Sequence, residues 1–443
     1  MPFKTATSSR NITPDRAISL AGQMVQRMGE YTRDPLEVNA VVIEQTDRRY
    51  GLVSCDLLCL DTPFIDSVVK ACLERHGVDH VLIACTHTHV GPCTRAFDPS
   101  GEVDDGYLEN LRNTLVEAIG ECCGRLEETR LYADCGYSGA MGWNRIGLRQ
   151  DGSAALHWGS WNSDFCGVEG PRDGDVPVIF ALRPDGSVQF VITGFATHPN
   201  CVAQGSFYSA DLPGETRRLL RSALGPELGV VYLTGAAGDT SPHLLKDNPD
   251  TRQPWHGEEG LIRSGRNLAG VVLQTLAGSI HPIEDETLAL ERREVAVPIR
   301  PWPEDFDIDR LDDRRRERAR QSREAWPDLV AKENPVKLSL NVLRIGDVAV
   351  CTNPGELYCR YGLAVKSNSP ARVTLISELT DGYVGYIPTP EAIGHGAYGA
   401  YPLFYCKLVP EAGDIVVDTT MELLWSRFER KGQAESIYGS RFA

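Results

Sequence analysis

The segment HVLIACTHTH at residues 80–89 joins an apolar run to two histidines that are separated by one threonine. The apolar run predicts a buried β-strand. Before it lie two strand-like segments, 38–43 and 51–55, joined by a polar turn, and a helix that begins near Pro63 and stops at Gly77. The four elements form a ββαβ unit, which indicates an α/β protein.

The same order of elements recurs near the C-terminus. Alternating apolar residues at 338–342 precede a strand at 348–351, a helix at 356–366 and a strand at 373–376. We therefore expect an α/β fold with a mixed β-sheet core flanked by helices and an internal ββαβ duplication. Each of the two copies would end a strand in polar or aromatic residues, and the two ends would meet at one site.

The middle of the chain carries further elements of the same kinds. A turn at 184–186 joins two strands, and the second of them, 188–196, runs into Thr197 and His198. A helix opens near Asp211, and an apolar strand follows at 230–233.

The prediction of a single domain depends on the lack of sequence features that mark domain boundaries. No solenoid repeat or low-complexity linker separates the chain, so we expect a single catalytic domain over residues 1–443. Within it, 301–336 is predicted to be a charged helical insertion. Its run 309–323 is typical of a solvated helix rather than of a binding patch.

Composition narrows the class of protein. The chain has 443 residues and a net charge of −16, which disfavours nucleic acid and anionic membrane surfaces as partners. No apolar run reaches the length of about 18 residues that a membrane span needs, and the N-terminus has no apolar signal segment. The thirteen cysteines form no CxxC pairs and mostly lie in apolar runs, which predicts reduced thiols and a cytoplasmic protein.

Reactive residues follow three separate strands. His87 and His89 follow the first, His198 the second, and Asp239 and Ser241 the third. Side chains alternate along an extended segment, so His87 and His89 project to the same side, and paired imidazoles suit zinc. The plainer interpretation is that strand-end histidines only form hydrogen bonds.

The spacing leaves the remaining ligands open. No HExxH motif completes a zinc site, and the residue pattern does not choose among Asp211, Asp239, Glu356 and others. Walker, GxGxxG and GxSxG motifs are also missing. Ser241 lies in a Gly-Asp-Thr-Ser-Pro turn, where it serves either the turn itself or as a nucleophile or substrate contact.

Six short motifs in order resemble the neutral, non-lysosomal ceramidase family over residues 11–430. They are Ala84-Cys85-Thr86-His87-Thr88-His89-Val90-Gly91-Pro92, Trp143-Asn144-Arg145, Phe195-Ala196-Thr197-His198-Pro199 with Ser209-Ala210-Asp211, Gly238-Asp239-Thr240-Ser241-Pro242, Pro354-Gly355-Glu356-Leu357, and Tyr383-Val384-Gly385-Tyr386-Ile387-Pro388-Thr389.

The resemblance implies a zinc amidase with one zinc per chain. In this family the metal ligands match His87, His198, Glu356 and Tyr386. The resemblance further implies that His89 and Arg145 contact the reacting amide, that Ser241 matches the residue described as the nucleophile, and that Tyr398 is a second active-site tyrosine. The physical chemistry agrees, because zinc can activate water and polarise a carbonyl, while Arg145 and His89 could stabilise an oxyanion.

Differences from the family leave the substrate undetermined. Secreted members carry a signal and a C-terminal immunoglobulin-like domain, neither of which is expected here, and His198-Pro199-Asn200-Cys201 differs from the family after its histidine. The leading hypothesis is a zinc hydrolase of the C–N amide bond of an N-acyl compound, either a ceramide of sphingolipid metabolism or another amide. The alternatives are a hydrolase of a small soluble amide, lactam or lactone on the same scaffold, and a non-catalytic zinc protein. The oligomeric state stays open.

Overall fold

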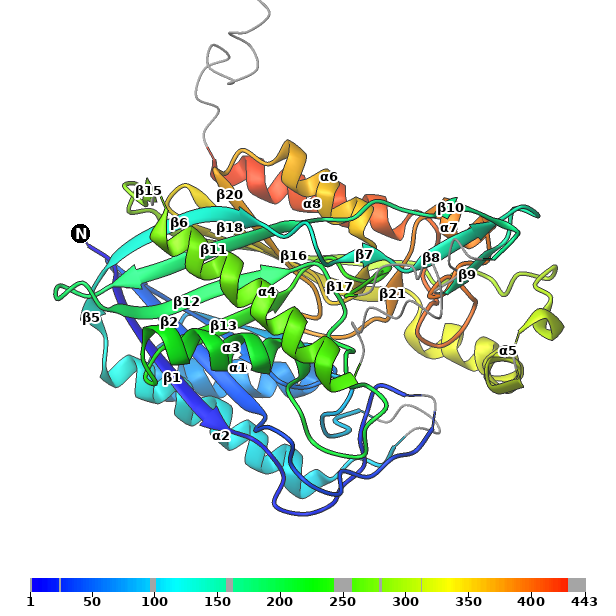
Figure 1. The fold of residues 1–443 in the computed structure, drawn as a ribbon, viewed down its shortest axis with the longest axis horizontal. Helices are drawn as coiled ribbons and strands as arrows, with labels where there is room; N and C mark the ends of the chain where they lie inside the picture. Colours follow the sequence, from blue (N-terminus) through cyan, green and yellow to red (C-terminus); the bar gives the residue numbers. More distant parts are fainter. Residues whose placement is uncertain are drawn as a thin grey trace, which may run out of the picture.

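Three β-sheets, each covered by a pair of helices, make up most of the computed structural model (Figure 1). The structure describes residues 2–23, 25–95, 101–156, 162–242, 257–278, 281–311 and 313–428. The predicted α/β class with a mixed sheet core flanked by helices is confirmed.

The first sheet has the order β4-β3-β2-β1-β5 and lies against helices α1 and α2. Its elements are β1 (Lys4–Asn11), β2 (Glu37–Gln45), β3 (Arg48–Cys55), α1 (Thr62–His76), β4 (His80–Cys85), α2 (Asp105–Gly124) and β5 (Glu127–Glu128). Helix α1 ends at Gly77, whose φ of 64° gives the left-handed conformation that glycine adopts readily.

The second sheet has the order β13-β12-β11-β6-β15 and lies against α3 and α4. Its elements are β6 (Arg130–Tyr137), β11 (Asp175–Leu182), β12 (Val188–Phe195), α3 (Asp211–Leu224), β13 (Gly229–Thr234), α4 (Gly257–Ala277) and β15 (His281–Pro282).

The third sheet has the order β16-β17-β18-β20 and lies against α6 and α8. Its elements are β16 (Leu288–Val297), β17 (Val336–Ile345), β18 (Val348–Thr352), α6 (Cys359–Asn368), β20 (Val373–Ser377) and α8 (Ala412–Arg427).

Short elements complete the described chain. They are β7 (Trp143–Asn144), β8 (Ile146–Arg149), β9 (Ala154–Leu156), β10 (Phe165–Val168), β14 (Thr240–Ser241), η2 (Ile308–Arg310), α5 (Asp313–Glu333), β19 (Glu356–Leu357), β21 (Tyr386–Ile387) and α7 (Pro390–Gly394). Helix α5 falls inside the predicted charged segment 301–336 and lies at one end of the molecule in Figure 1.

The ββαβ arrangement occurs three times, not twice. In each unit two antiparallel strands are followed by a helix and by a strand that pairs in parallel with the second: β2-β3-α1-β4, β11-β12-α3-β13 and β17-β18-α6-β20. The two units predicted from the sequence therefore exist, and a third lies between them. A duplication of two halves does not describe this arrangement.

Alternation of side chains explains how the sheets pack. In β2, Ala40 and Val42 face the cluster shared with α1 and α2, whereas Val41 and Ile43 face a cluster shared by all three sheets. That central cluster also takes Ile179 from the second sheet. The strands are therefore buried on both faces, which is why they appear as continuous apolar runs in the sequence.

Hydrogen bonds join the C-terminal ends of the last strands of the three ββαβ units. Thr86 follows β4, Thr234 ends β13 and Glu378 follows β20, and all three are buried. The Thr234 hydroxyl donates to the Thr86 carbonyl at 2.9 Å, and the Glu378 N–H donates to the Thr234 carbonyl at 2.9 Å. The three units thus meet at one place, and the loops that leave it carry the residues of the candidate site.

Two further predictions concern membrane-spanning segments and the state of the cysteines. Across the described ranges, no helix combines the length and the apolar character needed to cross a bilayer. None of the thirteen cysteines, all of which lie in the described ranges, forms a disulfide, and all but Cys123, Cys135 and Cys166 are buried.

Candidate functional site

Three histidines from two of the ββαβ units lie together beyond the strand ends. His87 and His89 follow β4, and His198 follows β12. The ring centroid of His87 lies 4.9 Å from that of His89 and 4.8 Å from that of His198. Their ligand atoms all lie within 4.8 Å of one another, so this cluster could hold a metal ion.

Backbone carbonyls set the tautomer of all three rings. The Nδ1 atoms of His87, His89 and His198 lie 2.9, 2.7 and 2.7 Å from the carbonyl oxygens of Leu58, Gly22 and Ala237. A carbonyl oxygen can only accept, so each Nδ1 carries a proton, and in a neutral ring the Nε2 then presents a lone pair. This is the arrangement that orients histidine ligands in metal sites.

Gly22 allows the contact to His89. It has a φ of +91°, and a Cβ atom at this position would lie 2.7 Å from the Cα of His89. Only glycine fits this close approach without a shift of the backbone.

Glu356 places a carboxylate against the imidazoles from the third unit. Its Oε2 lies 3.4 Å from Nε2 of His87 and 3.2 Å from Nε2 of His198. With Nδ1 as the donor of each neutral ring, all three atoms are acceptors, and they repel unless a proton or a metal ion lies between them. Oε2 of Glu356 and Nε2 of His87 are buried and have no hydrogen-bond partner among the described residues. A metal ion fits this set of donors.

Tyr386 and Arg145 close the site on one side. Strand β21 pairs in parallel with β19, so that Tyr386 lies opposite Glu356. The Tyr386 hydroxyl lies 3.5 Å from Nε2 of His198. Arg145 donates from one nitrogen to the Gly238 carbonyl at 2.8 Å and to the Tyr386 hydroxyl at 3.2 Å, and the same nitrogen lies 3.3 Å from Nε2 of His198.

Burial and charge keep His198 neutral. Removal from water lowers the pKa of His198 to about 3, and the Arg145 guanidinium contributes to the decrease. For Glu356, burial alone would raise the pKa, but His87 and His198 hold it well below its ordinary value. A neutral imidazole beside an ionised carboxylate is the protonation state that metal binding requires.

Two cavities lead to this cluster. The larger has a volume of about 980 Å³, and His89, Arg145 and Tyr398 are among its lining residues. The smaller, of about 90 Å³, is lined by His87, His89 and Glu356 and by tyrosines that include Tyr386 and Tyr398. Tyr398 also lies under the Arg145 guanidinium, 5.2 Å from ring centroid to Cζ. Seven of the predicted site residues are therefore brought together: His87, His89, Arg145, His198, Glu356, Tyr386 and Tyr398.

Ser241 is placed differently. It lies in β14, which pairs with β7, and its side chain is fully buried. Its hydroxyl has no hydrogen-bond partner among the described residues, and Ser241 is not among those that line the two cavities.

The other carboxylates that the sequence left open have structural partners. Asp211 accepts from the backbone N–H groups of Val202 and Leu212 at the start of α3. Asp239 accepts from the Asn144 side chain at 2.8 Å and from the Cys359 N–H at 2.7 Å.

Sequence reasoning missed two residues that support the site. The Glu378 carboxylate accepts from the N–H groups of Ala237 at 3.1 Å and Leu357 at 2.9 Å, and so joins the loop under His198 to the strand of Glu356. The Tyr383 hydroxyl donates to Glu356 at 2.7 Å. Glu378 lies two residues after the predicted strand 373–376, as His87 and His198 lie two residues after their predicted strands, and this position was the available signal.

Comparisons with known proteins identify the fold. No protein-family model matches the chain, and no curated protein sequence does. Among solved structures, a ceramidase complexed with C2 has a TM-score of 0.75 at 16% identity, over 96% of this chain and 75% of that one. Neutral ceramidase from Pseudomonas aeruginosa has a TM-score of 0.73 at 16% identity, over 96% of this chain and 74% of that one. The resemblance inferred from the short motifs is thus confirmed at the level of the fold.

Proposed function

We propose that this protein is a zinc-dependent hydrolase that cleaves the C–N amide bond of an N-acyl compound. The observation that carries the proposal is the position of Oε2 of Glu356 between Nε2 of His87 and Nε2 of His198, at 3.4 and 3.2 Å. Ligands at 2.0–2.1 Å in a tetrahedral zinc shell lie about 3.3 Å from one another. The two separations match that edge length.

The same criterion supports Tyr386 as the fourth ligand. Its hydroxyl lies 3.5 Å from Nε2 of His198, close to the edge of the same tetrahedron. His89 satisfies the looser criterion of a metal cluster. It lines both cavities, however, so we assign His89 to the substrate and His87, His198, Glu356 and Tyr386 to the zinc.

The protein's own groups would act on the amide. A zinc ion held there would supply a Lewis acid for the amide carbonyl and would make water acidic enough to attack near neutral pH. Nε2 of His89 would move a proton to or from the reacting groups. Arg145, fixed by the Gly238 carbonyl, would stabilise the negative charge that develops on the carbonyl oxygen. Ser241 has no base within hydrogen-bonding distance among the described residues, which favours water as the nucleophile.

The substrate class follows from the cavity and the fold. A volume of about 980 Å³ accommodates an acyl chain with its amine portion. Two solved structures with this fold are ceramidases, which supports an N-acyl substrate of ceramide type. An acyl-chain series tests this, because a lipid pocket gains about 0.8 kcal/mol for each CH₂ that it buries. Rates that do not change with chain length would favour a small amide, lactam or lactone instead.

Elemental analysis tests the metal. Protein purified in metal-free buffer and reloaded should contain about one zinc per chain, and His198→Ala should lose it. His281→Ala is the control, since His281 is exposed and pairs with Asp134 at the surface. Two tightly bound metals, or none, would overturn the ligand assignment. One zinc without turnover of any N-acyl amide would leave a non-catalytic zinc protein.

A further inference from the structure

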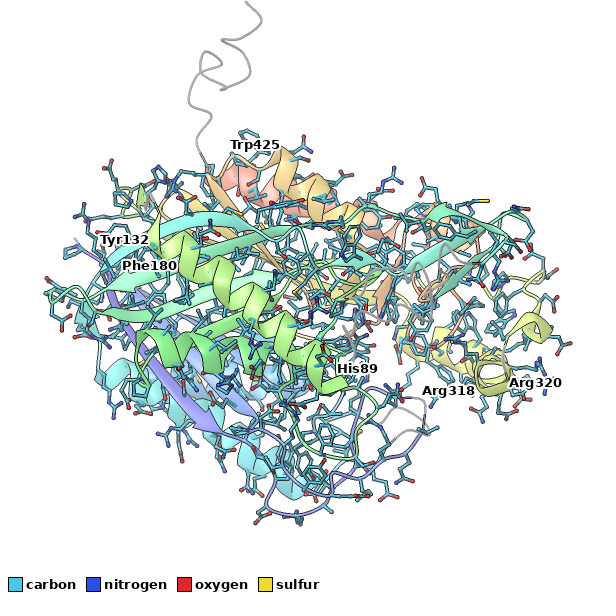
Figure 2. The ribbon with its side chains drawn as sticks, viewed as in Figure 1. His89, Tyr132, Phe180, Arg318, Arg320 and Trp425 are labelled. Atoms are coloured by element: carbon cyan, nitrogen blue, oxygen red, sulfur yellow. The ribbon has the colours of Figure 1, made fainter. Side chains whose placement is uncertain are left out.

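Asn200 follows the proposed zinc ligand His198 by two residues, in the segment that differs from the ceramidase motif. It lines the larger cavity together with His89 and Arg145, the two residues that we assign to the amide. Figure 2 shows His89 beside the lower end of helix α4, and Gly257, the first residue of α4, lines the same cavity. Asn200 has no part in the function proposed above, although it borders the same space.

Backbone contacts fix the loop that carries Asn200. The N–H group of Asn200 donates to the His198 carbonyl at 3.0 Å. The next two N–H groups, of Cys201 and Val202, donate to the Asp211 carboxylate at 3.2 and 2.9 Å. The Cys201 carbonyl accepts from the N–H group of the first residue of α4 at 2.7 Å. The loop is therefore tied to the neighbourhood of His198, to α3 and to α4.

The Asn200 side chain contains a buried acceptor without a donor. Its Oδ1 atom is buried and has no hydrogen-bond partner among the described residues. Among the described residues that line the larger cavity, Nε2 of His89 is the other buried acceptor with this property, and we assign it to proton transfer. A buried acceptor that lacks a donor costs about 1–3 kcal/mol, so its position in a cavity wall indicates a donor on the ligand.

A secondary amide bound at this site brings one donor, its N–H group. Its carbonyl oxygen is already assigned to Arg145 and the proposed zinc ion, and His89 is assigned to the proton that moves. The N–H group still needs an acceptor, because its removal from water without one is costly. Glu258, the one carboxylate among the described lining residues of the larger cavity, is bonded to Arg33 at 2.7 Å. Oδ1 of Asn200 is uncharged and unpartnered among the described residues, and so it fits this role.

We propose that Oδ1 of Asn200 accepts a hydrogen bond from the N–H group of the scissile amide, so that the protein selects secondary amides over esters and lactones. An ester or lactone has an oxygen atom in place of the N–H group, and this oxygen and Oδ1 would both be acceptors. A tertiary amide has no N–H group and would leave Oδ1 without a donor. This inference rests on the proposed amidase activity and names the class of bond that Asn200 selects.

Four octanoyl probes that differ by single groups test the inference. N-octanoylethanolamine is the secondary amide, and N-octanoyl-N-methylethanolamine lacks its N–H group. In 2-hydroxyethyl octanoate an ester oxygen replaces the N–H group. In N-(2-methoxyethyl)octanamide the N–H group stays, while a methyl ether replaces the hydroxyl. Hydrolysis of each probe releases octanoic acid, so one assay gives kcat/KM for all four with the zinc-loaded protein.

Asn200→Leu removes the acceptor and nearly keeps the size of the side chain. It should lower kcat/KM for the two probes with an N–H group by about 10- to 100-fold, because the bound N–H group loses its acceptor. The N-methyl amide and the ester should be hydrolysed at nearly unchanged rates. Asn110→Leu is the control, since Asn110 is exposed on α2, and it should change none of the four rates. Zinc content is measured for each variant, so that a loss of metal is recognised as such.

Asn200→Asp is a second variant, because a carboxylate keeps an acceptor at the same position. We expect it to retain the preference for the secondary amide over the N-methyl amide. A loss of equal size for all four probes in Asn200→Leu would overturn the inference. A loss confined to the three probes with a free hydroxyl would assign Asn200 to that hydroxyl and would overturn it as well.

The outcomes separate this inference from the proposed function. Hydrolysis of the secondary amide at a rate that does not depend on Asn200 would overturn the Asn200 contact and leave the amidase proposal intact. If no probe is hydrolysed, calorimetry on the zinc-loaded protein gives the affinities instead. Tighter binding of the secondary amide than of the N-methyl amide, with the difference lost in Asn200→Leu, would then support the contact while the amidase proposal fails. Equal binding of the two amides without hydrolysis would overturn both.

Discussion

The Tyr383 hydroxyl donates a 2.7 Å hydrogen bond to Oε1 of Glu356. The other oxygen of this carboxylate, Oε2, is the one that faces His87 and His198. Tyr383 therefore decides which carboxylate oxygen is directed at the candidate metal and which is held by the protein.

Removal of that hydroxyl should weaken the metal site without abolishing it. Tyr383→Phe keeps the ring and loses one hydrogen bond to a proposed ligand, so we expect zinc affinity to fall by about 10- to 100-fold. Competition with a chromogenic chelator measures the change. Tyr361→Phe is a matched control, since the Tyr361 hydroxyl has no partner among the described residues. Unchanged affinity in Tyr383→Phe would mean that the hydrogen bond does not orient the carboxylate.

Substitution of His89 and substitution of His87 should have different effects on zinc content. His89→Ala is expected to retain about one zinc per chain and to lose turnover by about 10²- to 10⁴-fold, because the ring would act in proton transfer or oxyanion stabilisation. His87→Ala is expected to lose the zinc itself. Elemental analysis together with turnover distinguishes the two variants, and equal loss of zinc from both would place His89 in the metal shell.

Ser241 should matter little to the chemical step. Its buried hydroxyl has no hydrogen-bonded base in the part of the chain that the structure describes, so we expect Ser241→Ala to keep kcat within about tenfold of the wild type. Single-turnover kinetics give the comparison. A decrease of about 10³-fold or more, with zinc and fold retained, would instead identify the serine as the nucleophile.

Asp239 should make stability depend on pH. Burial raises its pKa to about 7, whereas the unfolded chain has the ordinary value near 3.8. The folded protein thus holds this proton more tightly, and the stability that it contributes is complete below about pH 4 and lost as the pH rises to about 7. A shift of about three pKa units corresponds to about 4 kcal/mol.

The variant Asp239→Asn isolates this effect. An amide does not titrate, so the free energy of unfolding of the variant minus that of the wild type should increase by up to about 4 kcal/mol between pH 4 and pH 8. Urea denaturation of the zinc-free protein at both pH values measures it. A difference that stays constant with pH would show that Asp239 is ionised at both.

Local patterns predicted much of the fold. The strand before His87 and the strand before His198 are apolar runs of the right length, and Gly77 ends α1 where expected. The middle ββαβ unit was visible as separate elements but not as a third copy. Its long loop before Asp211 and the parallel pairing of β12 with β13 become evident only in three dimensions.

The site depended on contacts that no local pattern contains. The pair of Glu356 and Tyr386 comes from two short strands that are parallel neighbours only in the fold, so motif resemblance, not spacing, selected Glu356 over Asp211 and Asp239. Helix α5 packs through Ala319 and Ser322, which are too small or polar to form an apolar stripe. The predicted solvated helix was a consequence of that composition.

The joined strand ends have a consequence for biosynthesis. His87 belongs to the first ββαβ unit and Tyr386 follows the last strand of the third, so the site does not exist on a nascent chain until the third unit has left the ribosome. An emerging chain can form its early strands and helices, yet it holds only an incomplete set of donors. Acquisition of metal would then report that all three units have folded together, and chains that terminate before Tyr386 would remain inert.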